Sequence, residues 1–497
     1  MLNTDYLQFD ARREKPDPVY AHKLQGEVSR AAQGLVRLPR PMGPRCRAAR
    51  GGQKERLWQL PAQLPGWWRR AWGGAEMGSD EVRVLDALTG QVAAELLARS
   101  HLLAPEQVAD ALMDTAGSLG VTKARVYLAD LEQRHLRAVP GGAGESPEML
   151  AIDSTVAGHA YRTLRIHGGP VGDGGSRHRA WVPLVDGTER LGVLELTVAE
   201  MGDAMLARYE MLASFAALTI VSKSHYSDTY AQTRRSQPMA LQAEMVWAFL
   251  PPRTFATDGV MVTATLEPAY EVGGDAYDYS LTGNRLHVSV FDAVGHDLAA
   301  GLLASVAMAS CRSARRSGGT LQDIVTRTDH AIARQFGDSR FVTALLCDLD
   351  VATGVFSWIA CGHPPPLLIR GNKVIKELAG RPQPPLGLAE HHMGADRSIY
   401  RTLPGSDDGL PACTEQLEPG DRMLLYTDGV TEGRAADGSR FGIDLLSDFI
   451  IHHSHAGTPA PEMLRRLTRT ITEYQHGRLS DDATIVLIEW MPPDPLL

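Results

Sequence analysis

Four short acidic segments in the second half of the chain contain the residues best suited to chemistry. They read GGDAYD at 273–278, FDAVGHD at 291–297, YTDGV at 426–430 and SDDAT at 480–484. Each places one or two aspartates beside glycine or another small residue, at the end of a run that reads as a strand. Carboxylates that converge on one point repel one another unless a cation holds them, and ligands that offer only oxygen favour Mg²⁺ or Mn²⁺ over zinc. The four segments therefore indicate a two-metal hydrolase.

The elements that must position these aspartates are mostly strands. Residues 253–492 contain short β-rich runs, several of which alternate in period two: VMVTATLEP, RLHVSVFDA, TALLCDLD, VFSWIACG, PPLLIRG, DRMLLYTDG and ATIVLIEW. Helices are predicted over AAGLLASVAMASCRSARR, TLQDIVTRTDHAIARQF and PEMLRRLTRTITEYQ. Many antiparallel strands with a few amphipathic helices predict an α+β sandwich, with the sheets inside and the helices outside.

Residues 253–492 resemble the metal-dependent protein phosphatases (the PPM, or protein phosphatase 2C, family), and among them the bacterial SpoIIE-like branch. The resemblance rests on six stretches in the family's order: EVGGDAYDY, FDAVGHDLAAG, RFVTALLCDLD, ACGHPPPLLIRG, LEPGDRMLLYTDGVTEG and LSDDATIVLIEW. It implies a PPM-type α-β-β-α sandwich and a serine/threonine phosphatase that uses two Mn²⁺ or Mg²⁺ ions, with room for a third.

The resemblance also implies a role for individual residues. The implied metal ligands are Asp275, Asp292, the carbonyl of Ala293, Asp428 and Asp481. Asp292 would bridge the two ions, Asp275 (directly or through water) and Ala293 would bind the first ion, and Asp428 and Asp481 would bind the second. Water activated between the ions would then attack phosphorus in line, without a covalent phosphoenzyme.

One motif departs from the family pattern, which commonly reads Asp-Val-Ser-Gly-His/Lys-Gly and here reads Asp-Ala-Val-Gly-His-Asp. Asp297 in place of glycine is expected to add negative charge near the metals, and His296 or Asp297 could protonate the leaving oxygen. Asp278 and Asp482 are expected to support the ligands or to bind a weaker third ion. His363 in GHPPP is expected to shape the site through a rigid turn rather than to bind metal.

Residues 80–225 have the pattern of a separate α/β domain. The order helix–strand–strand–helix–hairpin–helix, with AGHAYRT, WVPL and RLGVLEL, resembles a GAF domain, a sensory module with a pocket for a small ligand. The ligand stays unknown: the region has no cysteine, which argues against a thioether-linked chromophore or an iron–sulfur cluster. His159, His167 and His178 could bind a haem, although isolated histidines are more often surface or core residues. A cyclic nucleotide or simple dimerisation remain alternatives.

Residues 226–252 predict a helical linker. Leu241, Met245 and Phe249 form an apolar stripe that stops at Pro251-Pro252, which favours a signalling helix in a homodimer over a simple spacer. Residues 1–76 are rich in Arg, Pro, Gly and Gln and contain 14 Lys/Arg against 7 Asp/Glu, so they predict a basic and mostly disordered segment.

Composition limits the remaining possibilities. A chain of 497 residues is too long for one core, and its net charge of −9 argues against general nucleic-acid binding. The five cysteines have no CxxC pair, which indicates free thiols in a reducing compartment. The N-terminus has no apolar signal region, and the apolar stretch at 212–221 is too short for a membrane span. The prediction is therefore a cytoplasmic protein.

Competing hydrolase classes lack their own motifs. A Cys-dependent phosphatase needs a CxxxxxR loop, and Cys311, Cys361 and Cys413 all lack the Arg. An HD-type phosphohydrolase could use His296-Asp297 but lacks the supporting His and Asp pattern, and no Asn-rich ATP-binding signature of a histidine kinase is present. The alternative from another class is a catalytically silent ligand-sensing scaffold that binds a signalling partner. By analogy with the SpoIIE-like branch, the expected substrate is phosphoserine or phosphothreonine on a small anti-sigma-factor antagonist, with the GAF-like domain as regulator.

Overall fold

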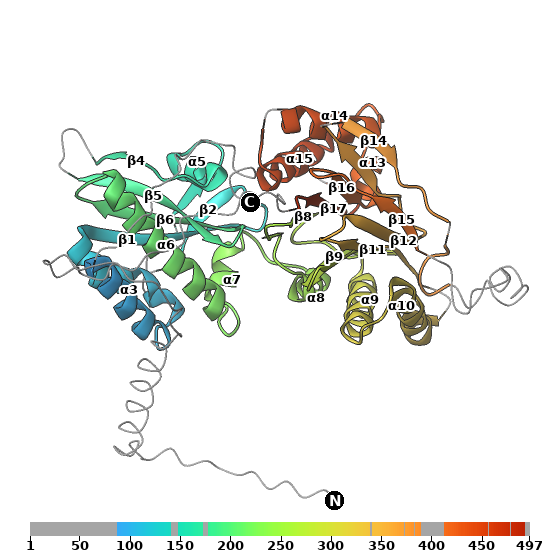
Figure 1. The fold of residues 1–497 in the computed structure, drawn as a ribbon, viewed down its shortest axis with the longest axis horizontal. Coiled ribbons are helices and arrows are strands. Elements are labelled where there is room, and N and C mark those ends of the chain that lie inside the picture. Colours follow the sequence, from blue (N-terminus) through green and yellow to red (C-terminus); the bar gives the residue numbers. More distant parts are fainter. Residues whose placement is uncertain are drawn as a thin grey trace, which may run out of the picture. The chain divides into compact units, whose positions relative to one another are not determined.

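The computed structural model describes residues 87–492 except 141–147, 172–176, 338–339, 372, 382, 389–411, 456 and 478. The basic segment 1–76, whose disorder is predicted above, and Cys46 lie outside the described residues. All of the described residues belong to one compact unit, Leu57–Leu497. They form an N-terminal half around one sheet and a C-terminal half around two sheets (Figure 1). The predicted domain boundaries themselves stay predictions.

The N-terminal half is built on an antiparallel sheet with the strand order β3-β2-β1-β6-β5-β4. Its strands are β1 (Val121–Ala129), β2 (His135–Ala138), β3 (Met149–Ala151), β4 (His167–Pro170), β5 (His178–Asp186) and β6 (Glu189–Val198). The predicted hairpin is confirmed: β5 and β6 meet at Asp186-Gly187, where Gly187 has φ +58°. A positive φ at a tight turn suits glycine, which has no Cβ to clash.

Helices cover both faces of this sheet, and the alternation of buried residues explains which helix covers which face. The helices are α3 (Ala87–Ser100), α4 (Val108–Ala116), α5 (Val156–Thr163) and α6 (Asp203–Lys223). Val126 and Leu128 of β1 pack in one cluster with α3, α4 and α6, whereas Tyr127 and Ala129 pack in another cluster with α5. Side chains in a strand alternate between faces, so one strand serves two cores.

The predicted elements of this half are present, but two short strands were missed. β3 and β4 have three and four residues and carry little apolar alternation, which leaves no periodic signal to detect. One stretch of α6, Met205–Lys223, has by length and composition alone what a membrane-spanning helix needs. Tyr209, Leu212 and Ala216 of this helix are fully buried in the core, so α6 packs as the core helix of this half.

Two helices connect the halves, α7 (Thr229–Arg234) and α8 (Leu241–Phe249). α8 ends at Phe249, before Pro251-Pro252, as predicted. The buried face of α8 is not the predicted stripe: Ala243 and Val246 are fully buried, whereas Leu241 is 61% exposed. Because apolar residues surround most of α8, periodicity could not choose the face that packs, and the neighbouring helix decided it.

That neighbour is α9 (Leu298–Arg316), which α8 approaches closely at Gly301. A Cβ on Gly301 would lie 2.7 Å from the Cβ of Gln242 in α8, closer than two such atoms can approach. Glycine at this position therefore permits the helix contact.

The C-terminal half is a sandwich of two antiparallel sheets, ordered β15-β12-β11-β10-β9 and β14-β13-β16-β17-β8-β7. The first sheet contains β9 (Asp275–Thr282), β10 (Arg285–Ala293), β11 (Val342–Asp350), β12 (Val355–Cys361) and β15 (Cys413–Gln416). The second contains β7 (Thr254–Ala256), β8 (Val260–Glu267), β13 (Leu367–Arg370), β14 (Lys373–Glu377), β16 (Arg422–Tyr426) and β17 (Ala483–Trp490).

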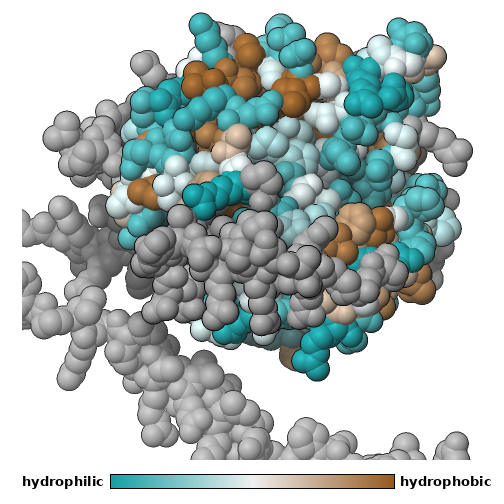
Figure 2. Space-filling view, turned by 90° about the vertical axis from the view of Figure 1, so that its right-hand side faces the viewer, coloured by the Kyte–Doolittle hydropathy of each residue, from teal (hydrophilic) through white to brown (hydrophobic). Residues whose placement is uncertain are grey.

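Helices lie outside both sheets, as predicted. α9 and α10 (Leu321–Phe336) pack on the first sheet, and α14 (Gly442–His455) and α15 (Ala460–Tyr474) pack on the second. The short α13 (Asp428–Glu432) follows β16, and neither α13 nor α14 was predicted. The face of the molecule seen in Figure 2 is largely hydrophilic, with hydrophobic residues in separate patches. The predicted α+β sandwich is therefore confirmed for this half.

Candidate functional site

The centre of the site is a pair of aspartates on neighbouring strands. Asp292 in β10 and Asp275 in β9 are direct register partners, so their side chains project from the same face of the first sheet. Asp275 is buried, with 1% of its surface exposed, and Asp292 is half-buried. Two adjacent carboxylates on one face are unfavourable unless protons or cations compensate them.

Two threonines from beside and within the second sheet hold Asp275: Thr427 directly follows β16, and Thr484 lies in β17. The Oγ1 atoms of Thr427 and Thr484 each donate a hydrogen bond of 2.7 Å to Asp275 Oδ2. The Thr484 backbone N–H donates in turn to Thr427 Oγ1 at 2.9 Å. These bonds join the two sheets and fix the direction of the carboxylate. The sequence reasoning assigned no role to either threonine, although both lie in the acidic motifs YTDGV and SDDAT.

Asp482 holds the backbone of the first acidic segment. Its Oδ2 accepts hydrogen bonds from the backbone N–H groups of Gly273 at 2.8 Å, Gly274 at 2.7 Å and Asp275 at 3.2 Å. A Cβ on Gly274 would lie 2.4 Å from the carbonyl oxygen of Ala293, so only glycine allows this close approach. Asp482 therefore has the supporting role that was one of its two predicted alternatives.

The pKa values of the acidic residues show that four carboxylates influence one another. Burial, followed by repulsion from Asp428 and Asp481, raises the pKa of Asp292 to about 7. Burial and the neighbouring Asp292 raise the pKa of Asp275 well above its usual value. Burial and Asp481 raise the pKa of Asp428. The structure thus brings Asp275, Asp292, Asp428 and Asp481 into one region.

The donor set of this region suits a divalent cation. Its donors are oxygens only, and the leading causes of the raised pKa values include no Lys or Arg, so the protein itself supplies little positive charge. Among the described residues, however, no group of three or more His, Cys, Asp or Glu side chains is arranged closely enough to hold an ion as it stands. The assignment of Asp275, Asp292, Ala293, Asp428 and Asp481 as ligands therefore stays a prediction.

His363 belongs to the frame of the site, as predicted. Its Nε2 lies 3.1 Å from the carbonyl oxygen of Tyr426, which can only accept, so Nε2 carries a proton. Burial lowers the pKa of His363 to about 4, and the ring is neutral. Its Nδ1 lies 2.9 Å from Thr343 Oγ1, which also lies 3.4 Å from Asp292 Oδ2. Because neutral Nδ1 accepts, the single hydroxyl proton of Thr343 can be donated either to His363 or to Asp292, and the shorter contact is to His363.

Asp297 as a proton donor and Asp278 as a support of the ligands do not fit the structure. Asp297 caps α9 by accepting the Ala300 N–H at 2.9 Å, and it pairs with Arg340 at 3.1 Å. The Arg340 hydrogen bond lowers the pKa of Asp297, so its charge is compensated and it is a poor proton donor. Asp278, three residues beyond Asp275, projects from the opposite face of β9 and does not support the site.

Asp278 instead forms ion pairs with two arginines of α9. It is buried, and its oxygens lie 2.7 Å from Arg312 Nη2 and 2.8 Å from Arg315 Nη1. These ion pairs attach α9 to the first sheet, and they leave Asp278 unsuited to bind a third ion.

The prediction that every acidic segment ends a strand is wrong for two of the four. Asp275 is the first residue of β9, and Asp481 precedes β17, which begins at Ala483. Asp292 lies near the end of β10 and Asp428 follows β16, as predicted. In an antiparallel sheet the end of one strand lies beside the start of the next, so strand starts and strand ends meet at one edge.

Comparison with known proteins finds a family model that matches part of the C-terminal half. Residues 282–491 match the model of the family described as Stage II sporulation protein E (SpoIIE). The matched range includes Asp292, Asp428 and Asp481, but it begins after Asp275. The N-terminal half lies outside it.

Two curated relatives come from Bacillus subtilis. Phosphoserine phosphatase RsbP is 24% identical over 241 residues, which cover 47% of this chain and 53% of RsbP. Phosphoserine phosphatase RsbU is 21% identical over 222 residues, which cover 44% of this chain and 60% of RsbU. The chain thus spans little more than half the length of these relatives. Among solved structures, the SiaA-PP2C domain of Pseudomonas aeruginosa is 22% identical, with a TM-score of 0.38, over 46% of this chain and 85% of that domain.

Proposed function

We propose that the protein is a metal-dependent serine/threonine protein phosphatase. The observation that carries the proposal is the register pair Asp275 and Asp292, with Asp428 and Asp481 close enough to raise the pKa of Asp292. The match of residues 282–491 to the SpoIIE family model supports it, as does the similarity to two phosphoserine phosphatases. The shared segment covers only part of each chain, so the activity of the whole protein is part of the proposal.

The residues that would hold two Mn²⁺ or Mg²⁺ ions are Asp275, Asp292, the Ala293 carbonyl, Asp428 and Asp481. When bound, such ions acidify a water and neutralise the charge on the phosphoryl oxygens. Thr427 and Thr484 orient Asp275 for this task, and Asp482 holds the backbone beneath it. Because these hydrogen bonds hold the ligand oxygens in position before the reaction begins, the oxygens do not have to reorient during it.

Three of the four cysteines that the structure describes do not suit a nucleophilic role. Cys311 and Cys361 are buried, and burial raises the pKa of each thiol to about 12. Cys347 is also buried, with a raised pKa. Thiols in this state carry little thiolate, which is the reactive form. Direct attack by water is therefore the reaction that we propose.

We propose phosphoserine or phosphothreonine on a small anti-sigma-factor antagonist as the substrate. The names of RsbP and RsbU, both phosphoserine phosphatases, support the phosphoserine part. Residues 80–225 would act as a GAF-like sensor for a small ligand, linked through α8 to the phosphatase in a cytoplasmic homodimer. The direct packing of α8 on α9 supports a regulatory role, because α9 begins at the Asp297 cap next to the site.

A catalytically silent scaffold is the second candidate. The observation that favours it is the lack, among the described residues, of three metal-binding side chains already close together. The scaffold would bind its partner with the same surface but would not turn over substrate.

Hydrolysis of p-nitrophenyl phosphate distinguishes the two candidates. Wild type, Asp292→Ala and Asp428→Ala are compared with Mn²⁺, with Mg²⁺ and with EDTA. The control is Glu377→Ala, an exposed carboxylate on the edge strand β14. Metal-dependent turnover in wild type and in the control, lost in both aspartate variants, is expected of the phosphatase. Absence of turnover in wild type with each metal, on this substrate and on a phosphorylated antagonist protein, would favour the scaffold.

A further inference from the structure

A second site lies between the two halves, away from the carboxylate region. A cavity of about 390 Å³ opens between α5 and β4 of the N-terminal half and the start of α15 in the C-terminal half. Its ionisable lining residues are His159, Arg162, Arg165, His167, Glu462 and Arg466. This volume lies in the range of small-molecule sites, which run from roughly 300 to 1,000 Å³.

Positive charge dominates the lining. Three arginines and two histidines face the cavity, and Glu462 is its acidic residue. The carboxylate of Glu462 already accepts hydrogen bonds from Arg465 and Arg466 at 2.9 Å and from Arg190 at 3.2 Å. Burial opposes its ionisation, but these arginines lower the pKa of Glu462 to about 2. Glu462 is therefore more than neutralised, and the cavity keeps a surplus of positive charge.

Two of the arginines keep hydrogen-bond donors to spare. Arg162 Nη2 donates only a long bond of 3.5 Å, to the carbonyl oxygen of Asp153, and its buried Nε has no partner, so a small shift of the guanidinium would be needed to offer Nε to a ligand. No hydrogen bond or ion pair joins exposed Arg165 to the rest of the chain that the structure describes. A buried donor without an acceptor is costly, so an acceptor brought by a ligand would be stabilising.

The start of α15 adds to the positive potential of the cavity, whereas the lowered pKa of His167 favours the neutral form of that ring. The rings of His159 and His167 lie 4.3 Å apart, and burial, then His159 and Arg165, lower the pKa of His167. The cavity is also lined by Gly457–Pro459, directly before the first residue of α15, Ala460. The N-terminus of a helix carries partial positive charge and favours anions.

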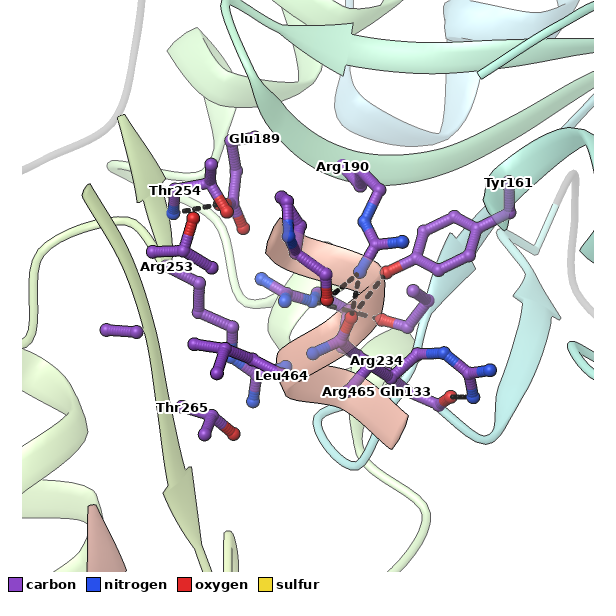
Figure 3. A pocket seen from close by; sticks show the side chains of 14 residues that line it. Gln133, Tyr161, Glu189, Arg190, Arg234, Arg253, Thr254, Thr265, Leu464 and Arg465 are labelled. Atoms are coloured by element: carbon purple, nitrogen blue, oxygen red, sulfur yellow. Dashed lines mark hydrogen bonds between the residues drawn. The ribbon is translucent and has the colours of Figure 1, made fainter. Parts of the chain in front are cut away.

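The cavity adjoins the contact that joins the two halves. Arg190 of β6 donates to the carbonyl oxygen of Pro461 at 2.9 Å and pairs with Glu462, and Arg465 pairs with Asp153 at 2.6 Å. Figure 3 shows this junction, where Arg190, Gln133, Tyr161 and Arg465 converge. The space enclosed there is only about 10 Å³, so the junction itself has room for one water at most.

We propose that the larger cavity binds a small phosphorylated anion. Arg162, Arg165 and Arg466 would hold its phosphoryl oxygens, since guanidinium groups suit phosphate. Arg466 is bound to Glu462, and Glu462 is bound to Arg190, so an anion on Arg466 acts on the contact between the halves. A bound anion would therefore contact Arg162 and Arg165 of the N-terminal half and Arg466 of the C-terminal half. Its binding does not depend on the phosphatase activity proposed above.

Calorimetric titration of the full chain with pyrophosphate, and separately with inorganic phosphate, tests this site. EDTA and the Asp292→Ala background remove binding at the carboxylate region. Saturable binding is expected, and Arg165→Ala should weaken it by about tenfold, the usual effect of losing one hydrogen bond to a charged group. Arg165 is exposed and without an ion pair to described residues, so this variant should fold normally. Arg381→Ala, an exposed arginine outside the cavity, is the control.

Hydrogen exchange locates the bound anion. Pyrophosphate is expected to slow exchange in 157–167 and 458–466, the segments that line the cavity. Absence of saturable binding would overturn the proposal. Equal binding by Arg165→Ala and wild type would also overturn it, as would protection confined to segments outside these two.

Discussion

Thr427 Oγ1 donates a hydrogen bond of 2.7 Å to Asp275 Oδ2 and thereby joins a residue that follows the second sheet to a residue that begins a strand of the first. The direction of this carboxylate is therefore decided by both sheets together. If the Thr427 hydroxyl is removed, the Asp275 carboxylate is oriented less precisely toward a metal ion, even though the carboxylate itself is unchanged.

Replacement of Thr427 tests that dependence. Thr427→Val keeps the shape of the side chain but removes the hydroxyl, so the apparent Mn²⁺ affinity is expected to fall by about tenfold to a hundredfold. Thr427→Ser restores the donor and should recover most of the affinity. Mn²⁺ titrations monitored by calorimetry measure this. Equal affinity in wild type and Thr427→Val would show that the hydrogen bond does not orient the site.

The raised pKa of Asp292 predicts a pH dependence of metal binding. Because its pKa is about 7, protons compete with the metal below that pH, and the affinity for Mn²⁺ should rise as the pH increases through 7. A carboxyl whose pKa is raised in the folded state stabilises the fold below its unfolded value and loses that contribution as the pH rises through the folded value. The metal-free protein should therefore become less stable from about pH 4 to above pH 7.

Thermal unfolding in EDTA across this range, and Mn²⁺ titrations below and above pH 7, measure both effects. Asp292→Asn has no titrating group at this position, so it should flatten both profiles. A wild-type affinity independent of pH between 6 and 8 would contradict the raised pKa.

Asp297 should matter for helix stability rather than for catalysis. Asp297→Ala removes the cap of α9 and the partner of Arg340, so the unfolding temperature is expected to fall, while metal-dependent turnover stays close to wild type. Asp297→Asn keeps an oxygen that can cap the helix and should lose less stability. Turnover that falls more than about tenfold in Asp297→Ala, with little change in stability, would place the residue in the chemistry instead.

The buried ion pair between Arg190 and Glu462 should hold the two halves together. Both side chains are less than 5% exposed, so Arg190→Ala leaves part of a buried charge uncompensated and should cost about 3 kcal/mol of unfolding free energy. Arg440→Ala, which breaks an exposed ion pair with Glu432 inside the C-terminal half, is the control and should cost less than about 1 kcal/mol. Urea denaturation measures both values.

Acid should weaken the same contact. Since the pKa of Glu462 is lowered to about 2, its contribution is present above its unfolded value, near 4.5, and is lost as the pH falls from there toward 2. A loss of stability in Arg190→Ala no larger than in Arg440→Ala would show that the pair does not support the contact.

Gly301 should be sensitive to the smallest substitution. Gly301→Ala places a Cβ against Gln242, so α8 must move away from α9, and a loss of about 1–3 kcal/mol is expected from overpacking. Gly90→Ala in α3 meets no atom within 4 Å and should be neutral or slightly stabilising, because alanine favours a helix. Equal unfolding free energies for the two variants would contradict the close helix contact.

The sequence by itself determined the class of the C-terminal half and the residues that converge in it. Short runs rich in β-branched and other apolar residues, several of them alternating in period two, predicted seven of its strands, because such runs are a local signal that survives in the fold. The four acidic motifs pointed to Asp275, Asp292, Asp428 and Asp481, since clustered carboxylates beside glycine are unusual in a strand-rich domain. Their assignment as metal ligands is a prediction that metal titration must test.

Only the tertiary structure decided which partners these residues have. Thr427 and Thr484 support Asp275 from another sheet, Asp278 faces α9, and Asp297 pairs with Arg340 across 43 residues of sequence. The sign and strength of such contacts depend on pairings between distant segments, on which face of a strand or helix is buried, and on the charge already present there. Pairings between distant segments and the local charge are not periodic along the chain, and periodicity alone did not select the buried face of α8, so spacing could not predict these contacts.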